Sequence, residues 1–204
     1  QHIIFKNITN TIYSIFRENN IQIKLSDNIE YSDDNLYIFV GINKLIKKYP
    51  KKYIIYQFEQ ANSYFLNDLG EKEYNYIFNE NYINILKNAI QVWDYSIQNK
   101  EWLSENIKIK NILYLPVCFN NNIINYKKNT IEKDIDILFY GSLNKKKKNI
   151  LNKLRNLDNN LVIVIKNNDC WEEDLLDIIS RSKIVLNIHY YENAILELHR
   201  LSYL

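Results

Sequence analysis

The side chains best suited to chemistry gather in one stretch near the carboxyl end of the sequence, residues 183–200. An apolar run over 184–188 is short and rich in β-branched residues, which predicts a buried strand. A polar, aromatic turn over 189–193 follows, and a helical pattern then begins with three residues spaced for one buried face: Ile195, Leu198 and Leu201. This stretch holds two histidines, His189 and His199, and Glu197 with its potential ion-pair partner Arg200. A strand that ends in a polar loop before a helix is where α/β proteins place ligand sites.

A second group of candidates follows two other predicted strands. Gly141 and Ser142 come directly after the strand predicted over 136–140, and a run of four lysines, 145–148, then begins a predicted helix. Lys166 follows the strand predicted over 161–165. A glycine turn with cations at a helix start is suited to binding phosphate, because backbone N–H groups and positive charge both face the anion.

Two carboxylates occupy the same kind of position in the first half of the chain. Glu59 follows the apolar run over 53–58, and Asp94 follows the run over 89–93. A carboxylate just beyond a strand can act as a general base or bind an acceptor. The alternative is structural, since either residue could cap the helix that comes next.

The elements that must position these residues alternate between strand and helix. Strands are predicted over 21–25, 36–40, 53–58, 89–93, 112–115, 136–140, 161–165 and 184–188. Helices are predicted over 8–18, 44–49 (with Asn43 as its cap), 62–88 with an interruption near Gly70, from 96 through 102, from 145 onward, 171–180 and after 193. This alternation with short connections predicts α/β architecture, in which parallel sheets carry helices on both faces. The carboxyl ends of the strands would then meet at one edge of each sheet.

An Asn- and Lys-rich segment with little periodicity separates the two halves. We therefore predict a first Rossmann-like domain over residues 1–119, a linker over 120–133 and a second Rossmann-like domain over 134–204. The second domain is expected to be incomplete, because the alternation stops within the helix that follows the last strand.

Composition excludes several classes of function. The net charge of +2 is too small to favour nucleic acid as the main partner. No apolar run approaches the roughly 20 residues of a transmembrane helix, and no signal peptide is recognisable at the start. Cys118 and Cys170 lie far apart and outside any metal-binding spacing, so we expect no metal site and a reduced, cytoplasmic environment.

Several segments resemble the glycosyltransferases of the GT-B fold, a family found in bacteria and large DNA viruses. Residues 139–148 resemble the first strand and phosphate loop of the donor domain in that family, and residues 184–200 resemble the strand and helix that carry its nucleotide-binding glutamate. Residues 56–60 and 92–96 are similar to parts of its acceptor domain. The resemblance covers most of the chain and implies a viral or bacterial type of nucleotide-sugar-dependent enzyme, expected to be a hexosyltransferase. Donor domains of the family continue beyond this helix, which suggests a truncated or reduced form.

The resemblance also implies roles for individual residues on the donor side. Gly141 would let the backbone approach the diphosphate, and Lys147 or Lys148 matches the diphosphate-binding lysine, with Lys166 as a further cation. Ser142 stands where many relatives carry arginine. Glu197 aligns with the glutamate that binds the ribose hydroxyls, and a carboxylate suits a vicinal diol because it offers two acceptors.

The last implied role belongs to His189, which could contact the sugar or phosphate. It occupies the place of another glutamate found in retaining relatives, so retention of configuration cannot be inferred. On the acceptor side, Glu59 or Asp94 would be the general base of an inverting reaction. The implied donor is a UDP- or GDP-sugar, with no resident cofactor and no metal, and the acceptor could be a glycan, a protein or a lipid.

Simpler interpretations of the same residues stay open. The lysine run could be a solvated helix start, Glu197 a surface glutamate paired with Arg200, and His189 the end of a strand. The chain could then be a non-catalytic Rossmann-like module that binds a nucleotide or a protein. An NAD-dependent enzyme is disfavoured, because the three glycines are isolated and form no Gly-x-Gly-x-x-Gly motif.

Overall fold

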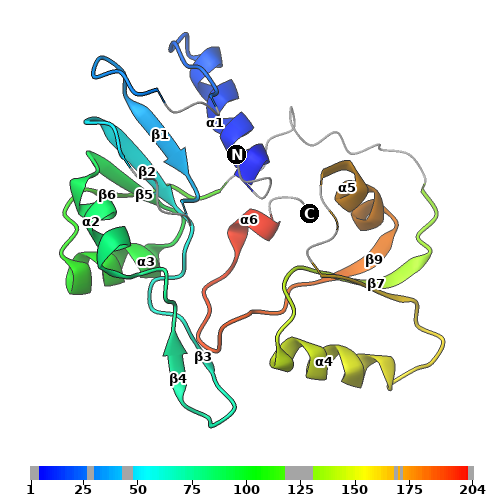
Figure 1. Cartoon of the computed structure of the whole chain (residues 1–204). Helices are drawn as coiled ribbons and strands as arrows, with labels where there is room; N and C mark the ends of the chain where they lie inside the picture. The colour runs from blue at the N-terminus through cyan, green and yellow to red at the C-terminus, as the bar shows by residue number, and fades with distance from the viewer. Residues whose placement is uncertain are drawn as a thin grey trace.

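The computed structural model contains two parallel β-sheets with helices packed on them, and a separate two-stranded hairpin (Figure 1). It describes residues 5–26, 30–42, 48–117, 131–167, 170 and 172–201, apart from the side chains of residues 172, 173 and 199. The fold is therefore mixed α/β with parallel sheets, as the alternation predicts.

The first sheet has four parallel strands in the order β1-β2-β5-β6. The strands are β1 (Tyr37–Val40), β2 (Tyr53–Gln57), β5 (Gln91–Asp94) and β6 (Ile112–Tyr114). Every residue of β2 is buried. A parallel strand that is covered on both faces reads as a continuous apolar run, which is why β2 was recognisable in the sequence.

Helices cover both faces of the first sheet (Figure 1). On one face, Ile8 of α1 (Lys6–Glu18) packs with Ile54 and Tyr56 of β2. On the other face, α2 (Glu80–Asn88), α3 (Ile97–Trp102) and the π-helical turn η2 (Leu103–Ile107) form the second core. Asn79 and Ser96 cap α2 and α3, because each side-chain oxygen accepts a backbone N–H in the first turn.

The second sheet has three parallel strands, with β7 (Ile135–Tyr140) between β8 (Ile163–Lys166) and β9 (Ser182–Leu186). Helix α5 (Glu172–Ser180) packs on one face through Leu175 and Ile179. Helix α4 (Lys145–Arg155) lies on the opposite side in Figure 1, and its Leu151 is fully buried.

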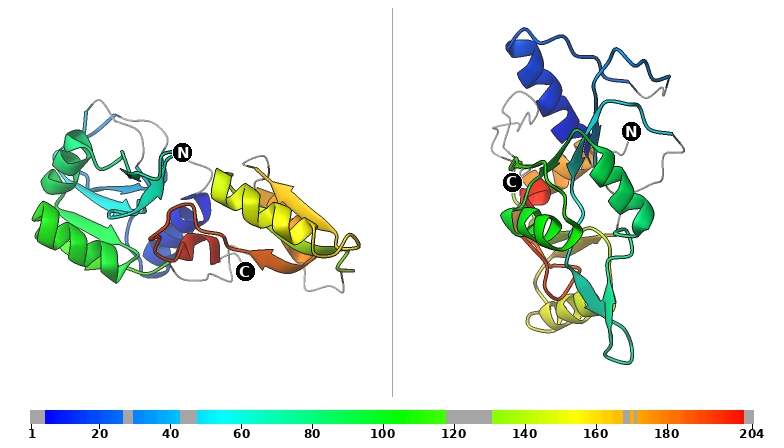
Figure 2. Two further views of the ribbon diagram at one scale, coloured as in Figure 1. Left: turned by 90° about the horizontal axis from the view of Figure 1, so that it is seen from below. Right: turned by 90° about the vertical axis from the view of Figure 1, so that its left-hand side faces the viewer.

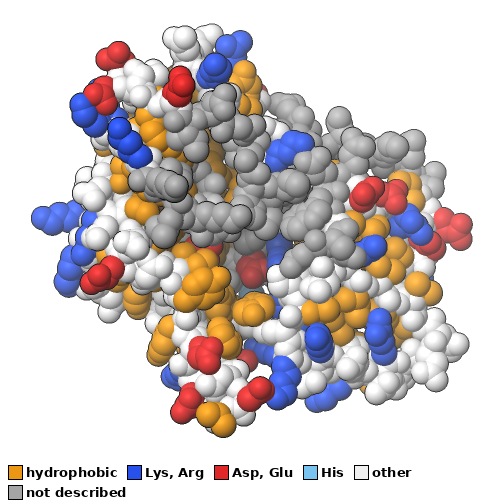
Figure 3. Space-filling model, in the orientation of Figure 1, with side chains coloured by type: hydrophobic (Ala, Val, Ile, Leu, Met, Phe, Trp, Pro, Cys, Tyr) orange, Lys and Arg blue, Asp and Glu red, His pale blue; other side chains and the backbone are white. Residues whose placement is uncertain are grey.

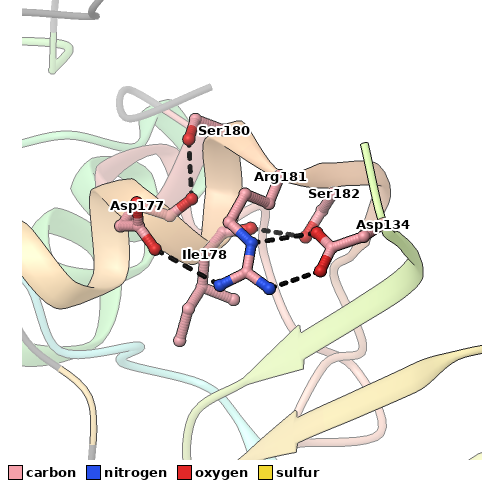
Figure 4. Close-up of polar contacts among 6 residues, drawn as sticks. All are labelled: Asp134, Asp177, Ile178, Ser180, Arg181 and Ser182. Atoms are coloured by element: carbon pink, nitrogen blue, oxygen red, sulfur yellow. Dashed lines mark hydrogen bonds and ion pairs between the residues drawn. The ribbon is translucent and has the colours of Figure 1, made fainter. Parts of the chain in front are cut away.

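The amino ends of β7 and β9 are joined by Arg181 (Figure 4). Its Nε donates to Asp134 Oδ1 at 2.9 Å, and its Nη2 donates to Asp134 Oδ2. Its Nη1 also lies 3.5 Å from Asp177 of α5. The carboxyl edge of this sheet, at the other end of the strands, holds the predicted site residues.

Two predicted elements are wrong. The helix predicted over 62–88 forms only from Glu80, and a hairpin of β3 (Tyr64–Leu66) and β4 (Lys72–Tyr74) precedes it. Gly70 turns this hairpin with a positive φ of 79°, a conformation that favours glycine. The segment predicted as a strand over 21–25 is irregular and largely exposed, and it pairs with none of the described strands.

The last predicted strand and helix are shifted. Strand β9 begins and ends two residues before the predicted run, at Ser182 and Leu186. The helix after residue 193 is the single turn α6 (Leu198–Leu201), so Glu197 immediately precedes it.

The segment after β9 leaves the second sheet and packs on the first, beside α1 (Figures 1 and 2). Ile195 and Leu198 join the core face that contains Phe58 and Trp93. Gln60 Oε1 accepts a hydrogen bond from the backbone N–H of Ile195 at 3.0 Å. This crossing places the carboxyl edges of the two sheets next to each other.

Some predictions concern residues outside the described part of the chain. These are the cap and first residues of the helix predicted over 44–49, Cys118, Trp171, and the predicted linker up to residue 130. Among the helices that are described, none combines the length and the apolar character needed to cross a bilayer.

Candidate functional site

Gly141 forms a sharp turn at the end of β7. Its φ is 118°, which a residue with a side chain rarely adopts, and its N–H donates to Lys166 O at 2.8 Å. A Cβ at this position would lie 2.5 Å from Nη2 of Arg200. The turn therefore needs glycine for its backbone conformation and for the guanidinium that packs against it.

Lys147 carries a buried ammonium group beside this turn, and only 1% of the residue is exposed. Its Nζ donates to Ser142 O at 3.0 Å and lies over the rings of Phe139 and Tyr190, at 5.4 and 5.3 Å from their centroids. Burial, followed by the charge of Arg200, lowers the pKa of Lys147 to about 8. Asn144 holds the residue in place, because its Oδ1 accepts the backbone N–H of Lys147 as the cap of α4.

Glu197 and Arg200 form an ion pair next to Lys147. Arg200 Nε lies 2.9 Å from Glu197 Oε2, and both side chains are largely buried. The negative charge of Glu197 raises the pKa of Lys147, whereas the positive charge of Arg200 lowers it. Gly141, Lys147 and Glu197, all predicted as donor-binding residues, therefore lie together at the carboxyl edge of the second sheet.

His189 lies beyond the end of β9, on the crossing segment. Its Nδ1 is buried and has no hydrogen-bond partner among the described residues, and the same holds for Oδ1 of Asn187. Buried polar atoms are normally paired, so a ligand or a water molecule would complete these two.

The remaining donor-side candidates are placed differently. Ser142 contributes its carbonyl oxygen, as the acceptor for Lys147. Lys166 ends β8 beside the Gly141 turn and is partly buried. Lys148 is exposed on α4, so the structure places Lys147 rather than its neighbour in the buried cluster. Lys and Arg side chains gather on the surface over α4 (Figure 3).

On the first sheet, Glu59 lies just beyond β2 and is partly exposed. Its Oε2 accepts a long hydrogen bond of 3.4 Å from Asn75, and its backbone N–H donates to Gln57 Oε1. Burial raises the pKa of the Glu59 carboxyl, against the smaller effect of Asn75.

Asp94 is fully enclosed at the end of β5, with 0% of its surface exposed. Its Oδ2 accepts from Gln57 Nε2 at 2.7 Å, and its Oδ1 accepts from the backbone N–H of Ser96 at 2.8 Å. Burial raises its pKa to about 7. Both carboxylate oxygens of Asp94 therefore already accept hydrogen bonds from neighbouring residues. The residue that caps α3 is Ser96, not Asp94.

Two tyrosines, Tyr95 and Tyr191, lie near carboxylates of both sheets. The pKa of Tyr95 is raised by burial and then by the charges of Asp94, Glu197 and Glu59. The pKa of Tyr191 is raised to about 12 by burial, and Glu59 and Glu197 both contribute. Carboxylates of both sheets therefore lie near these two phenols.

Hydrogen bonds and ion pairs hold the hairpin and the second sheet together around this site. Tyr64 O accepts from Glu192 N, and Tyr64 N donates to Asn193 Oδ1 at 3.0 Å. Lys146 pairs with Glu192 at 2.9 Å, and Asn144 Nδ2 donates to Tyr190 O at 2.8 Å. The loop over 190–193 thus contacts α4 on one side and the hairpin on the other.

Arg200, Tyr190 and Tyr191 were not among the predicted site residues. Arg200 was expected only to pair with Glu197, and two tyrosines stand out little in a chain that contains 17. The three-residue spacing of Glu197 and Arg200 was the signal in the sequence that pointed to Arg200. The contact of Arg200 with Gly141 depends on the fold and could not be read from that spacing.

The chain was compared with protein-family models, with curated proteins and with solved structures, and none of the three comparisons found a match.

Proposed function

We propose that this chain is a nucleotide-sugar-dependent glycosyltransferase with the GT-B arrangement, and that its donor binds where the two sheets meet. The observation that carries the proposal is the cluster of Gly141, Lys147 and Glu197 at the carboxyl edge of one parallel sheet, opposite Glu59 of the other. Carboxyl edges of parallel sheets are the usual ligand sites of doubly wound folds.

On the donor side, Lys147 would bind the diphosphate and stabilise the negative charge that develops on it as the leaving group departs. A buried ammonium acts more strongly than an exposed one, because little water screens it. Glu197 would accept hydrogen bonds from the ribose hydroxyls, and His189 would contact the sugar or phosphate through its unpaired Nδ1.

On the acceptor side, Glu59 is the better general base of the two predicted carboxylates. It is partly exposed, whereas Asp94 is enclosed and fully hydrogen bonded. In an inverting reaction, Glu59 would take the proton of the acceptor hydroxyl while that oxygen bonds to the anomeric carbon and the bond to the diphosphate breaks. The raised pKa of Glu59 would stop this reaction, as pH falls, at a higher pH than for an ordinary glutamate.

The experiment is a turnover assay of the full chain with UDP- and GDP-hexoses, in which release of the nucleoside diphosphate and transfer to glycan acceptors are followed. Glu59→Gln should lower kcat by roughly 100-fold or more while nucleotide affinity changes little, because only proton transfer is lost. Glu101→Gln is the matched control, since Glu101 is exposed on α3.

Two results would count against the proposal in different ways. Nucleotide binding without hydrolysis or transfer of any donor would favour the non-catalytic nucleotide-binding module. Turnover that is equal in wild type and Glu59→Gln would leave the transferase activity intact and remove Glu59 as its base.

A further inference from the structure

The guanidinium of Arg200 lies against the turn at the end of β7. Its Nη1 donates to Tyr140 O at 3.0 Å, and its Cζ lies 5.7 Å from the centroid of the Tyr140 ring. A Cβ on Gly141 would be within 3 Å of three guanidinium atoms. Arg200 therefore covers the glycine at which a phosphate would approach the backbone.

Two buried or nearly buried cations meet here with one carboxylate. Lys147 and Arg200 are close enough for the charge of Arg200 to lower the pKa of Lys147, and Glu197 is the counter-charge of both. The neighbouring Lys146 is already paired with Glu192. The cluster of Lys147, Arg200 and Glu197 thus carries one excess positive charge, which an anion would balance.

We propose that Arg200 is the second phosphate-binding cation of the donor site, acting beside Lys147. The proposal rests on the function proposed above and names a residue that the sequence assigned only to an ion pair. A guanidinium presents a fork of N–H donors that matches phosphate oxygens. When a diphosphate binds, Arg200 turns from Glu197 to the phosphate, and the carboxylate of Glu197 becomes free for the ribose hydroxyls.

Calorimetric titration of the full chain with UDP and GDP, and with the matched monophosphates UMP and GMP, tests this role. Arg200→Gln should weaken diphosphate binding by about tenfold or more, as expected for the loss of a charged hydrogen bond, and should affect the monophosphate much less. Arg200→Lys should recover part of the diphosphate affinity, because it restores the charge without the fork.

Arg181→Gln is the matched control, since it removes an ion-paired arginine at the opposite end of the same sheet (Figure 4). It should leave both affinities unchanged.

Three results would overturn the proposal. Equal affinity of wild type and Arg200→Gln for the diphosphates, or an equal loss for diphosphates and monophosphates, would reduce Arg200 to an anchor for α6 and leave the proposed function standing. If the wild type binds no nucleotide, the proposed function fails and the role of Arg200 fails with it.

Discussion

At the scale of single residues, the most informative side chain is Lys147. Its ammonium is enclosed by two aromatic rings and one carbonyl oxygen, and it shares Glu197 with Arg200. A lysine needed only for folding would gain from a carboxylate of its own or from exposure to water. Its enclosure beside a glycine turn is better explained by an anion that binds there.

Nucleotide binding should therefore depend on the protonation of Lys147. Since the pKa of Lys147 is lowered to about 8, affinity for UDP or GDP should fall as pH rises through that value, well below the range of an ordinary lysine. Titrations between about pH 6 and pH 9.5 measure this.

Lys147→Met should weaken diphosphate binding by about tenfold or more and remove this pH dependence. Lys148→Met is the control, because Lys148 is exposed on the same helix. An equal effect of both substitutions would indicate general attraction of anions to α4 rather than a specific contact.

The burial of Asp94 predicts that the stability of the protein depends on pH. Its pKa is raised from 3.8 to about 7 in the folded chain, so between these values the folded state holds a proton that the unfolded state has lost. The contribution of Asp94 to the free energy of unfolding therefore decreases as pH rises from about 4 to 7, by about 4 kcal/mol in total. Above about pH 7 this contribution no longer changes with pH.

Asp94→Asn should remove this slope. The measurement is urea denaturation of wild type and variant at several pH values, from which the difference in free energy of unfolding is plotted. A difference that does not change between about pH 4 and pH 8 would contradict the buried, ionisable environment of Asp94.

At the scale of elements, the short helix α6 determines whether the site exists at all. It carries Arg200 and immediately follows Glu197, yet it belongs to the core of the other sheet through Leu198. Glu197 and Arg200, which we propose bind the donor at the second sheet, are thus positioned by packing on the first.

Leu198→Ala should lower the free energy of unfolding by about 1–3 kcal/mol, since the side chain is only partly buried. It should also weaken nucleotide binding, because Glu197 and Arg200 lose their support. Chemical denaturation and calorimetry measure the two effects. Leu196→Ala is the control: Leu196 is exposed, so neither quantity should change appreciably. A loss of stability with unchanged affinity would show that the site does not depend on this packing.

The elements that were predicted well from the sequence are those whose pattern of apolar residues fits only one kind of secondary structure. Buried parallel strands such as β2 read as apolar runs, and α4 begins at the lysine run over 145–148, as predicted, and continues with helical spacing. The hairpin was missed because exposed apolar residues such as Leu66 and Tyr74 imitate the spacing of a helix. The interruption predicted near Gly70 is the turn of this hairpin.

At the scale of the whole molecule, the candidate site is the place where two separate sheets share one edge. The sequence predicted Gly141, Lys147 or Lys148, and Glu197 on one side, with Glu59 or Asp94 on the other. In the structure Gly141, Lys147 and Glu197 lie together, and Glu59 is the more exposed of the two carboxylates at the facing sheet. The sequence could not place Arg200 over Gly141, because contacts between residues far apart in the chain depend on how the crossing segment packs. For the same reason, the enclosure of Asp94 was not predictable.

The central claim is that Glu197 binds the ribose of a nucleotide held between the two sheets. The most direct measurement compares UDP with 2′-deoxy-UDP, and GDP with 2′-deoxy-GDP, by calorimetry on wild type and Glu197→Ala. Removing the 2′-hydroxyl should cost wild type about 1–2 kcal/mol of binding free energy and should cost the variant almost nothing, because the partner of that hydroxyl is gone. Failure of wild type to bind any of these nucleotides, or an equal cost in both proteins, would contradict the claim.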